Sequence, residues 1–105
     1  MSIDVLTRDT AMVRLRAAEP QIRSLGVHRL ALFGSVARYG ARQDSDVDLL
    51  VEFAPAQKIF DRFLALSDLL EDLLGRPVEL VTPEALSPYI GPHILAEAAD
   101  VLRAA

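Results

Sequence analysis

The chain has 105 residues, of which 51% are hydrophobic, and it carries a formal net charge of -4 at pH 7. This length and composition predict one folded domain with one hydrophobic core, spanning residues 1–105, and exclude a disordered chain. The acidic balance disfavours direct nucleic-acid binding, which depends on lysine and arginine contacts with phosphates. The sequence has no cysteine, so disulfides and thiolate metal sites are excluded.

Two features argue against membrane insertion and export. No apolar stretch approaches the roughly 20 residues that a membrane-spanning helix needs. Residues 1–16 carry acidic and arginine side chains where a signal peptide needs an uninterrupted apolar stretch. We therefore expect a soluble cytoplasmic protein without a membrane partner.

The first third of the chain predicts helical structure followed by a buried strand. Residues 7–25 have helical character, and Pro20 should divide them, because proline breaks a helix interior but fits a first turn. Gly26 is a suitable helix stop. Residues 28–33 are nearly continuous in apolar side chains, which is typical of a strand covered on both faces.

A short helix and a turn are expected before the second strand. Residues 35–39 can form a short helix after a glycine, and residues 40–45 have the composition of a turn. Residues 47–53 predict the second strand, which Pro55 would end. The connection between the first two strands is too long for a simple hairpin.

The second half of the chain predicts a helix, a strand and another helix. Residues 58–74 place apolar side chains at helical spacing and are followed by Gly75 as a stop. Residues 78–81 predict a third strand, and residues 92–103 predict a last helix. The long helix between the second and third strands favours a parallel crossover. We therefore expect an α/β or α+β layer with a small sheet.

Two aspartates stand at the entrance of the second strand, in the sequence SDVDLLVEF. Side chains two residues apart on a strand point to the same side, so Asp46 and Asp48 should lie together if the strand begins by residue 46. Neighbouring carboxylates repel each other unless one is protonated or a cation lies between them. The pair is therefore a suitable site for Mg²⁺, which prefers oxygen ligands and completes its coordination with water and substrate phosphate.

The end of the first strand offers the complementary half of such a site. Gly34 has no Cβ, so a ligand can approach the backbone closely, and Ser35 opens a short helix whose free N–H groups favour an anion. Arg38 lies one turn further and could reach the same anion; the alternative is an ordinary surface charge. Phosphates on one side and metal on the other describe a metal-nucleotide complex.

Glu79 is the best candidate for a third carboxylate. It interrupts the apolar run VELV, in a strand that should lie beside the second strand. In two-metal chemistry one ion holds the triphosphate and the other activates the attacking hydroxyl. Glu79 could hold that second ion and accept a proton; the alternative is an exposed strand residue.

Together, Gly34-Ser35 and Asp46-x-Asp48, in LFGSVAR and SDVDLLVEF, resemble the motif of the nucleotidyltransferase superfamily that includes DNA polymerase β. More narrowly, the chain resembles the minimal nucleotidyltransferases encoded beside HEPN-domain proteins. The resemblance covers nearly the whole chain. It implies a nucleotidyltransferase fold, in which a small mixed sheet is flanked by helices.

The resemblance also implies an activity. Family members use Mg²⁺ and ATP or another NTP, release pyrophosphate, and in toxin-antitoxin pairs transfer AMP to a tyrosine of a HEPN ribonuclease. Carried over here, Asp46 and Asp48 would be catalytic metal ligands, Glu79 the third acid, and Gly34 and Ser35 the phosphate turn. Two positions differ from the common pattern: Glu79 stands where aspartate is usual, and Tyr39 intervenes between Arg38 and Gly40.

The last predicted helix, HILAEAADVL, is more apolar than a solvated terminal helix needs to be. We expect this surface to bind a partner that supplies the acceptor, most simply a HEPN-type toxin, or to support a homo-oligomer. One alternative function is a non-catalytic antitoxin that neutralises its partner by direct association. Another is nucleotide transfer to RNA ends or a small molecule.

Overall fold

The computed structural model describes residues 6–34, 46–55, 60–89 and 91–103. The short helix expected at residues 35–39 and the turn at 40–45 lie outside these ranges. In chain order the elements are α1 (Arg8–Ala17), α2 (Glu19–Ser24), β1 (Val27–Phe33), β2 (Val47–Phe53), α4 (Phe60–Leu74), β3 (Val78–Val81), the 3-10 helix η1 (Pro83–Ala85), α5 (Gly91–Glu97) and β4 (Ala99–Leu102). None of the described helices is long and apolar enough to cross a bilayer.

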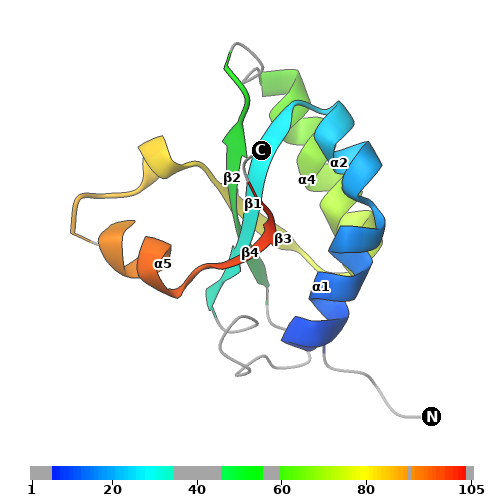
Figure 1. Ribbon diagram of the computed structural model, residues 1–105, viewed down its shortest axis with the longest axis horizontal. Helices are drawn as coiled ribbons and strands as arrows, with labels where there is room; N and C mark the ends of the chain where they lie inside the picture. Colours follow the sequence, from blue (N-terminus) through cyan, green and yellow to red (C-terminus); the bar gives the residue numbers. More distant parts are fainter. Residues whose placement is uncertain (1–5, 35–45, 56–59, 90, 104–105) are drawn as a thin grey trace.

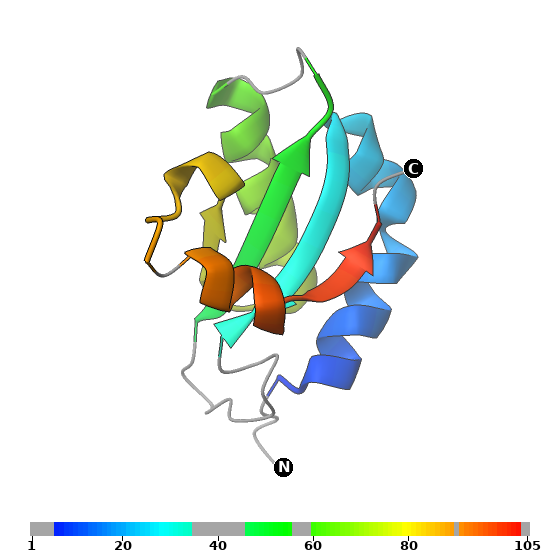
Figure 2. The same cartoon turned by 60° about the vertical axis from the view of Figure 1, so that its left-hand side comes forward.

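The described strands form one mixed four-stranded sheet in the order β3-β2-β1-β4. Strand β1 pairs antiparallel with β2 and β4, whereas β3 pairs parallel with β2 across the α4 connection. Helices α1, α2 and α4 cover one face of the sheet, and α5 lies on the other (Figures 1 and 2). The expected small mixed sheet flanked by helices is therefore confirmed, as is the parallel pairing of the second and third strands.

Proline and glycine set the helix boundaries as the sequence predicts. Helix α1 ends at Ala17, and α2 begins at Glu19 with Pro20 in its first turn, where the missing N–H costs no helical hydrogen bond. Gly26 and Gly75 follow α2 and α4 with φ of 87° and 66°. This left-handed conformation favours glycine, and it ends both helices.

The main hydrophobic core lies between the helices and the sheet. Helix α4 contributes Leu66, Leu70 and Leu74, which are buried at helical spacing. From the central strands, alternate residues point into this core: Leu30, Leu32, Val47, Leu49 and Val51. Because strand side chains alternate, the residues between them face the opposite side of the sheet.

The prediction of a last helix over residues 92–103 is wrong. The helix ends at Glu97, and Ala99–Leu102 form β4, an edge strand antiparallel to β1. Val101 and Leu102 are buried in the main core, and the strand gains backbone hydrogen bonds that a helix at the sheet edge would not make. A short apolar run does not by itself distinguish helix from strand, and here tertiary pairing decides.

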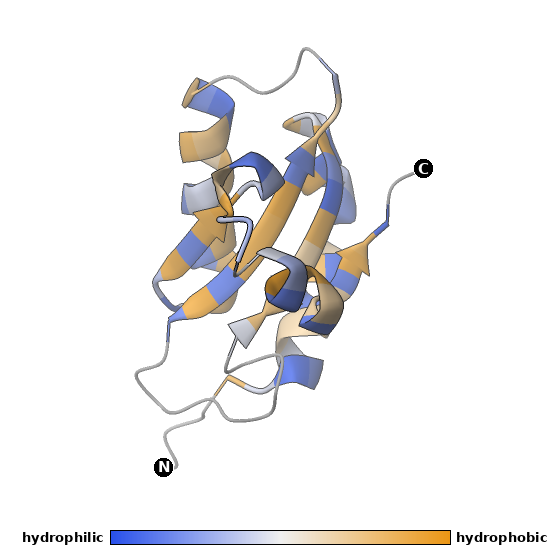
Figure 3. Ribbon diagram, turned by 90° about the vertical axis from the view of Figure 1, so that its left-hand side faces the viewer, coloured by the Kyte–Doolittle hydropathy of each residue, from blue (hydrophilic) through white to orange (hydrophobic). Residues whose placement is uncertain are grey.

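The opposite face of the sheet carries a smaller core. Ala31, Phe33 and Leu50 are buried there, and Leu86 and Ile94 pack against them from the segment after η1 and from α5. Figure 3 views the molecule from this side and shows α5 in front of hydrophobic strand segments. The cover is partial, so this face can hold a pocket.

Candidate active site

The ends of three strands meet at the predicted site. In the sheet register Phe33 of β1 is the partner of Asp48 of β2, and Asp48 is the partner of Glu79 of β3. Neighbouring strands lie about 4.8 Å apart, and partnered side chains share a face. The carboxylates of Asp48 and Glu79 therefore lie side by side, on the face that carries α5.

Both carboxylates line one pocket of about 370 Å³. Ser87 adds a hydroxyl, and the remaining lining is apolar: Phe33, Val81, Ala85, Leu86 and Ile94. Asp48 is partly buried and Glu79 is exposed. The pocket thus combines a polar, acidic side with an apolar wall, which is the usual composition of a small-molecule site.

Gly34 lies directly against the acidic side of this pocket. It follows β1 with φ of 76°, and a Cβ placed on it would overlap Oδ2 of Asp48. Gly34 and Asp48, the second carboxylate of the predicted motif Asp46-x-Asp48, are therefore in direct contact. Ser35 and Arg38, the other predicted phosphate-binding residues, lie outside the described residues.

Asp46 immediately precedes β2 and is exposed. Its neighbour Val47 donates its backbone N–H to the carbonyl of Pro77 at 2.9 Å, which fixes the start of β2 beside β3. Within the described ranges, no three histidine or acidic side chains come close enough to form a metal-binding cluster. The structure thus brings Asp48 and Glu79 together beside Gly34, with Asp46 two residues from Asp48.

The Asp48–Glu79 pair has the donor chemistry that a magnesium ion needs. Mg²⁺ binds hard oxygen ligands, usually with one or two protein carboxylates, and takes its remaining ligands from water and substrate phosphates. Two adjacent carboxylates beside a pocket fit one such ion. Binding of a second ion would require Asp46 as a further ligand, and the two-ion site stays a prediction.

Other acids on the same face have a different role. Arg29 Nη1 contacts Glu52 Oε2 at 2.9 Å, and Arg29 Nε contacts Asp100 Oδ1 at 2.8 Å. These two hydrogen bonds, with Asp100 the stronger influence, raise the pKa of Arg29 above its usual value. Glu52 and Asp100 are thus neutralised by a cation of the protein itself, and they fasten β1 to its two neighbours.

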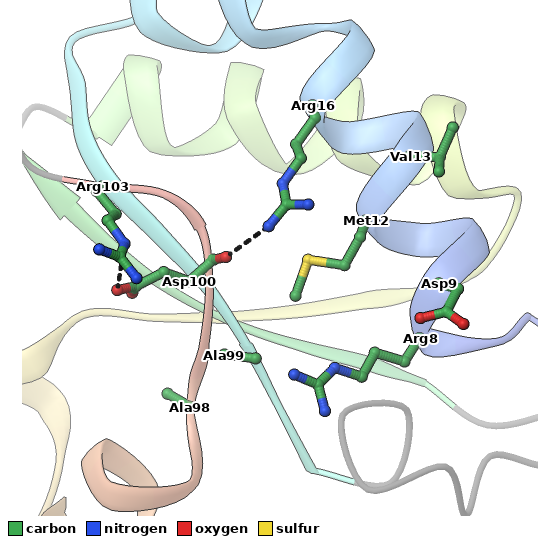
Figure 4. A pocket seen from close by; sticks show the side chains of 9 residues that line it. All are labelled: Arg8, Asp9, Met12, Val13, Arg16, Ala98, Ala99, Asp100 and Arg103. Carbon is green, nitrogen blue, oxygen red and sulfur yellow. Dashed lines mark hydrogen bonds and ion pairs between the residues drawn. The ribbon is translucent and has the colours of Figure 1, made fainter.

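A larger pocket, of about 620 Å³, lies between α1 and β4 (Figure 4). Arg16 crosses from α1 and donates to the backbone carbonyls of Val101 and Asp100 at 3.4 and 3.3 Å. Arg103 contacts Asp100 at 3.7 Å. The Arg16 hydrogen bonds hold the edge strand to α1, and the lining shares no residue with the carboxylate pocket.

The sequence reasoning missed the apolar wall of the carboxylate pocket. Leu86, Ser87 and Ile94 reach it only because the segment after β3 folds back over the sheet. A signal was present: Pro83 and Pro88 bracket a short segment that cannot continue as a regular strand or helix. That signal predicts a break in the chain but not the direction in which it turns.

A mixed sheet that presents adjacent carboxylates beside a glycine turn is the arrangement expected of an enzyme acting on a nucleotide with a divalent cation. Residues 15–101 match the family model described as the nucleotidyltransferase domain. The chain belongs to this family, and it is an enzyme of the nucleotidyltransferase kind. The resemblance seen in the sequence motifs is thereby confirmed.

Two close relatives agree with this family. The protein adenylyltransferase MntA of Thermococcus cleftensis is 36% identical over 94 residues, which cover 89% of this chain and 94% of the relative. A solved structure of a minimal nucleotidyltransferase is 37% identical, with a TM-score of 0.77, covering 88% of this chain and 93% of the other. This chain is therefore similar to both over most of its length.

A more distant likeness is to a chain in the complex of tri-AMPylated Shewanella oneidensis HEPN toxin with MNT antitoxin. The identity is 17%, the TM-score is 0.61, and the match covers 89% of this chain and 72% of the other. At this identity the likeness shows a common fold.

Proposed function

We propose that this enzyme transfers AMP from ATP, with Mg²⁺, to a hydroxyl of a HEPN-type toxin, most simply a tyrosine, and thereby acts as its antitoxin. The observation that carries the proposal is the in-register pair Asp48–Glu79, which faces a pocket directly beside Gly34. This pair supplies metal ligands at the point where a phosphate-binding turn begins.

In this proposal the predicted residues divide between metal binding and phosphate binding. Asp46, Asp48 and Glu79 would hold the metal, while Gly34, Ser35 and Arg38 would hold the phosphates. Bound Mg²⁺ would neutralise the triphosphate and lower the pKa of the attacking hydroxyl. The acceptor oxygen would bond to the α-phosphorus as the bond to pyrophosphate breaks, and Glu79 would take the hydroxyl proton.

The proposed acceptor and partner are supported by the chemistry of the pocket and by the names of the relatives. The apolar wall of Val81, Leu86 and Ile94 suits a flat ring beside the carboxylates, either a nucleobase or a phenol. The Thermococcus relative is named a protein adenylyltransferase, and the Shewanella complex pairs an MNT antitoxin with an AMPylated HEPN toxin. Both favour a protein hydroxyl over RNA or an antibiotic.

The test is label transfer to a HEPN-type partner, with ATP labelled on either the α- or the γ-phosphate. The α label should appear on the partner and the γ label should not, because nucleotidyl transfer releases the γ-phosphate in pyrophosphate. A chelator, or the double variant Asp46→Asn/Asp48→Asn, should abolish the signal. No α-label transfer by the wild type, or equal transfer by the double variant, contradicts the enzymatic proposal.

The alternative is a binding module that neutralises its partner by covering it. The one observation that favours it is that the described residues form no cluster of three acids. Growth of cells that express the toxin separates the two functions. Full protection by the double asparagine variant would show that binding suffices, and loss of protection would show that the reaction is needed.

Glu79 gives a prediction of its own. Glu79→Gln removes the charge but keeps the shape, and should lower the rate of AMP transfer by about 100-fold, whereas Glu79→Asp should keep most of the activity. Initial rates of α-label transfer at saturating ATP measure both, with Asp68→Asn at an exposed position of α4 as the matched control. A wild-type rate in Glu79→Gln would show that Glu79 is an exposed strand residue without a role in the reaction.

A further inference from the structure

Gly34 packs directly against the side chain of Asp48. A Cβ on Gly34 would overlap Oδ2 of Asp48 and would stand 3.0 Å from its Cγ and 3.2 Å from its Cβ. The Asp48 carboxylate therefore occupies the place where the Cβ of a side chain at position 34 would be. Any residue other than glycine at this position requires the carboxylate to move.

The backbone of Asp48 has no freedom to move away. It is paired on one side with Phe33 of β1 and on the other with Glu79 of β3. The flanking residues Val47 and Leu49 are fully buried in the main core. Any side chain at position 34 would therefore displace the Asp48 carboxylate by rotating it, because shifting β2 would disrupt a close-packed core.

From this geometry we infer that Gly34 is a positioning residue. Because Gly34 has no side chain, the Asp48 carboxylate can occupy the adjacent space and keep the orientation in which it would bind the metal. The inference rests on the proposed function and deepens it. A glycine that only admitted phosphate would affect nucleotide affinity. Gly34 acts through Asp48, so its loss should weaken the binding of the divalent cation first.

Gly75 provides a matched control within the same chain. Both glycines have a left-handed backbone, with φ of 76° at Gly34 and 66° at Gly75. A Cβ on Gly75 would meet nothing within 4 Å. Both positions favour glycine because of their positive φ. Only at position 34 would an added side chain also meet other atoms.

The experiment compares Gly34→Asn with Gly75→Asn, because asparagine tolerates a left-handed conformation but brings a Cβ. The Mg²⁺ concentration that gives half-maximal α-label transfer should rise at least about 10-fold in Gly34→Asn and stay near wild type in Gly75→Asn. Mn²⁺ binding, followed by electron paramagnetic resonance with excess non-hydrolysable ATP analogue, should weaken in parallel. An unchanged Mg²⁺ dependence, or a change in ATP affinity alone, overturns the inference.

A third variant covers the case in which Gly34→Asn does not fold. D-alanine at position 34, introduced by chemical synthesis, suits a positive φ and carries its methyl group at the other Cα hydrogen position, not at the one that overlaps Oδ2 of Asp48. Wild-type Mg²⁺ dependence in this variant supports the inference, and an impaired one overturns it. If the wild type transfers no label, the proposed function fails, while Mn²⁺ binding by the same variants still decides the role of Gly34.

Discussion

Asp48→Asn is expected to lower the rate of AMP transfer at least about 1,000-fold, which corresponds to about 4 kcal/mol of transition-state stabilisation. Asparagine keeps the size and one hydrogen-bonding oxygen of the side chain but removes the charge that a divalent cation needs. Asp48 pairs with Phe33 of β1 and Glu79 of β3, which places its carboxylate beside both Gly34 and Glu79. Initial rates of α-label transfer at saturating Mg²⁺ and ATP measure the effect.

Two controls keep this result interpretable. The urea midpoint and circular dichroism of Asp48→Asn should match wild type, because the substitution is nearly isosteric and the site is only partly buried. Asp68→Asn changes the net charge equally at an exposed position of α4 and should leave the rate unchanged. A rate for Asp48→Asn within a few-fold of wild type would remove Asp48 from the site.

The choice of Asp48 and Glu79 over the other acids follows from their neighbours. Glu52 and Asp100 point to the same face of the sheet, but Arg29 binds both at under 3 Å. Among the described residues, the Glu79 side chain forms no ion pair or hydrogen bond. Glu79, an acid beside the pocket that Arg29 does not contact, is therefore the position of the two where an external cation would lower the electrostatic energy most.

The parts of this fold set by local sequence were predictable. The boundaries of β2 and β3 agree with the expected 47–53 and 78–81, because apolar strands flanked by turn residues leave little freedom. Pro20 divides the first helices as expected. The resemblance indicated Gly34 and Asp48 as a pair, but their steric dependence requires the β1–β2 register, which local sequence does not specify.

The parts set by tertiary contacts were not predictable. The last element became a strand because Val101 and Leu102 complete the core at the edge of β1. Local pattern alone could not choose between helix and strand for that run. Ile94, which lines the carboxylate pocket from α5, depends on the same pairing, because α5 leads directly into β4. This long-range pairing therefore helps to set the position of α5 beside the pocket.

The largest expected loss of stability comes from Leu49→Ala. Leu49 is fully buried between Asp48 and Leu50 on β2 and faces the main core. Removing its three outer carbons leaves a cavity and should lower the free energy of unfolding by about 3–4 kcal/mol. Urea denaturation followed by circular dichroism measures the change, and Leu64→Ala, on a side chain that is 46% exposed, should cost less than about 1 kcal/mol.

The activity of Leu49→Ala separates support of the site from chemistry. Its transfer rate per folded molecule should stay within a few-fold of wild type at temperatures where it remains folded, because Asp48 keeps its partners in β1 and β3. Equal stability of Leu49→Ala and Leu64→Ala would contradict the assigned core. If the rate per folded molecule fell as far as in Asp48→Asn, the position of the carboxylate would depend on core packing behind β2 as well as on the space left by Gly34.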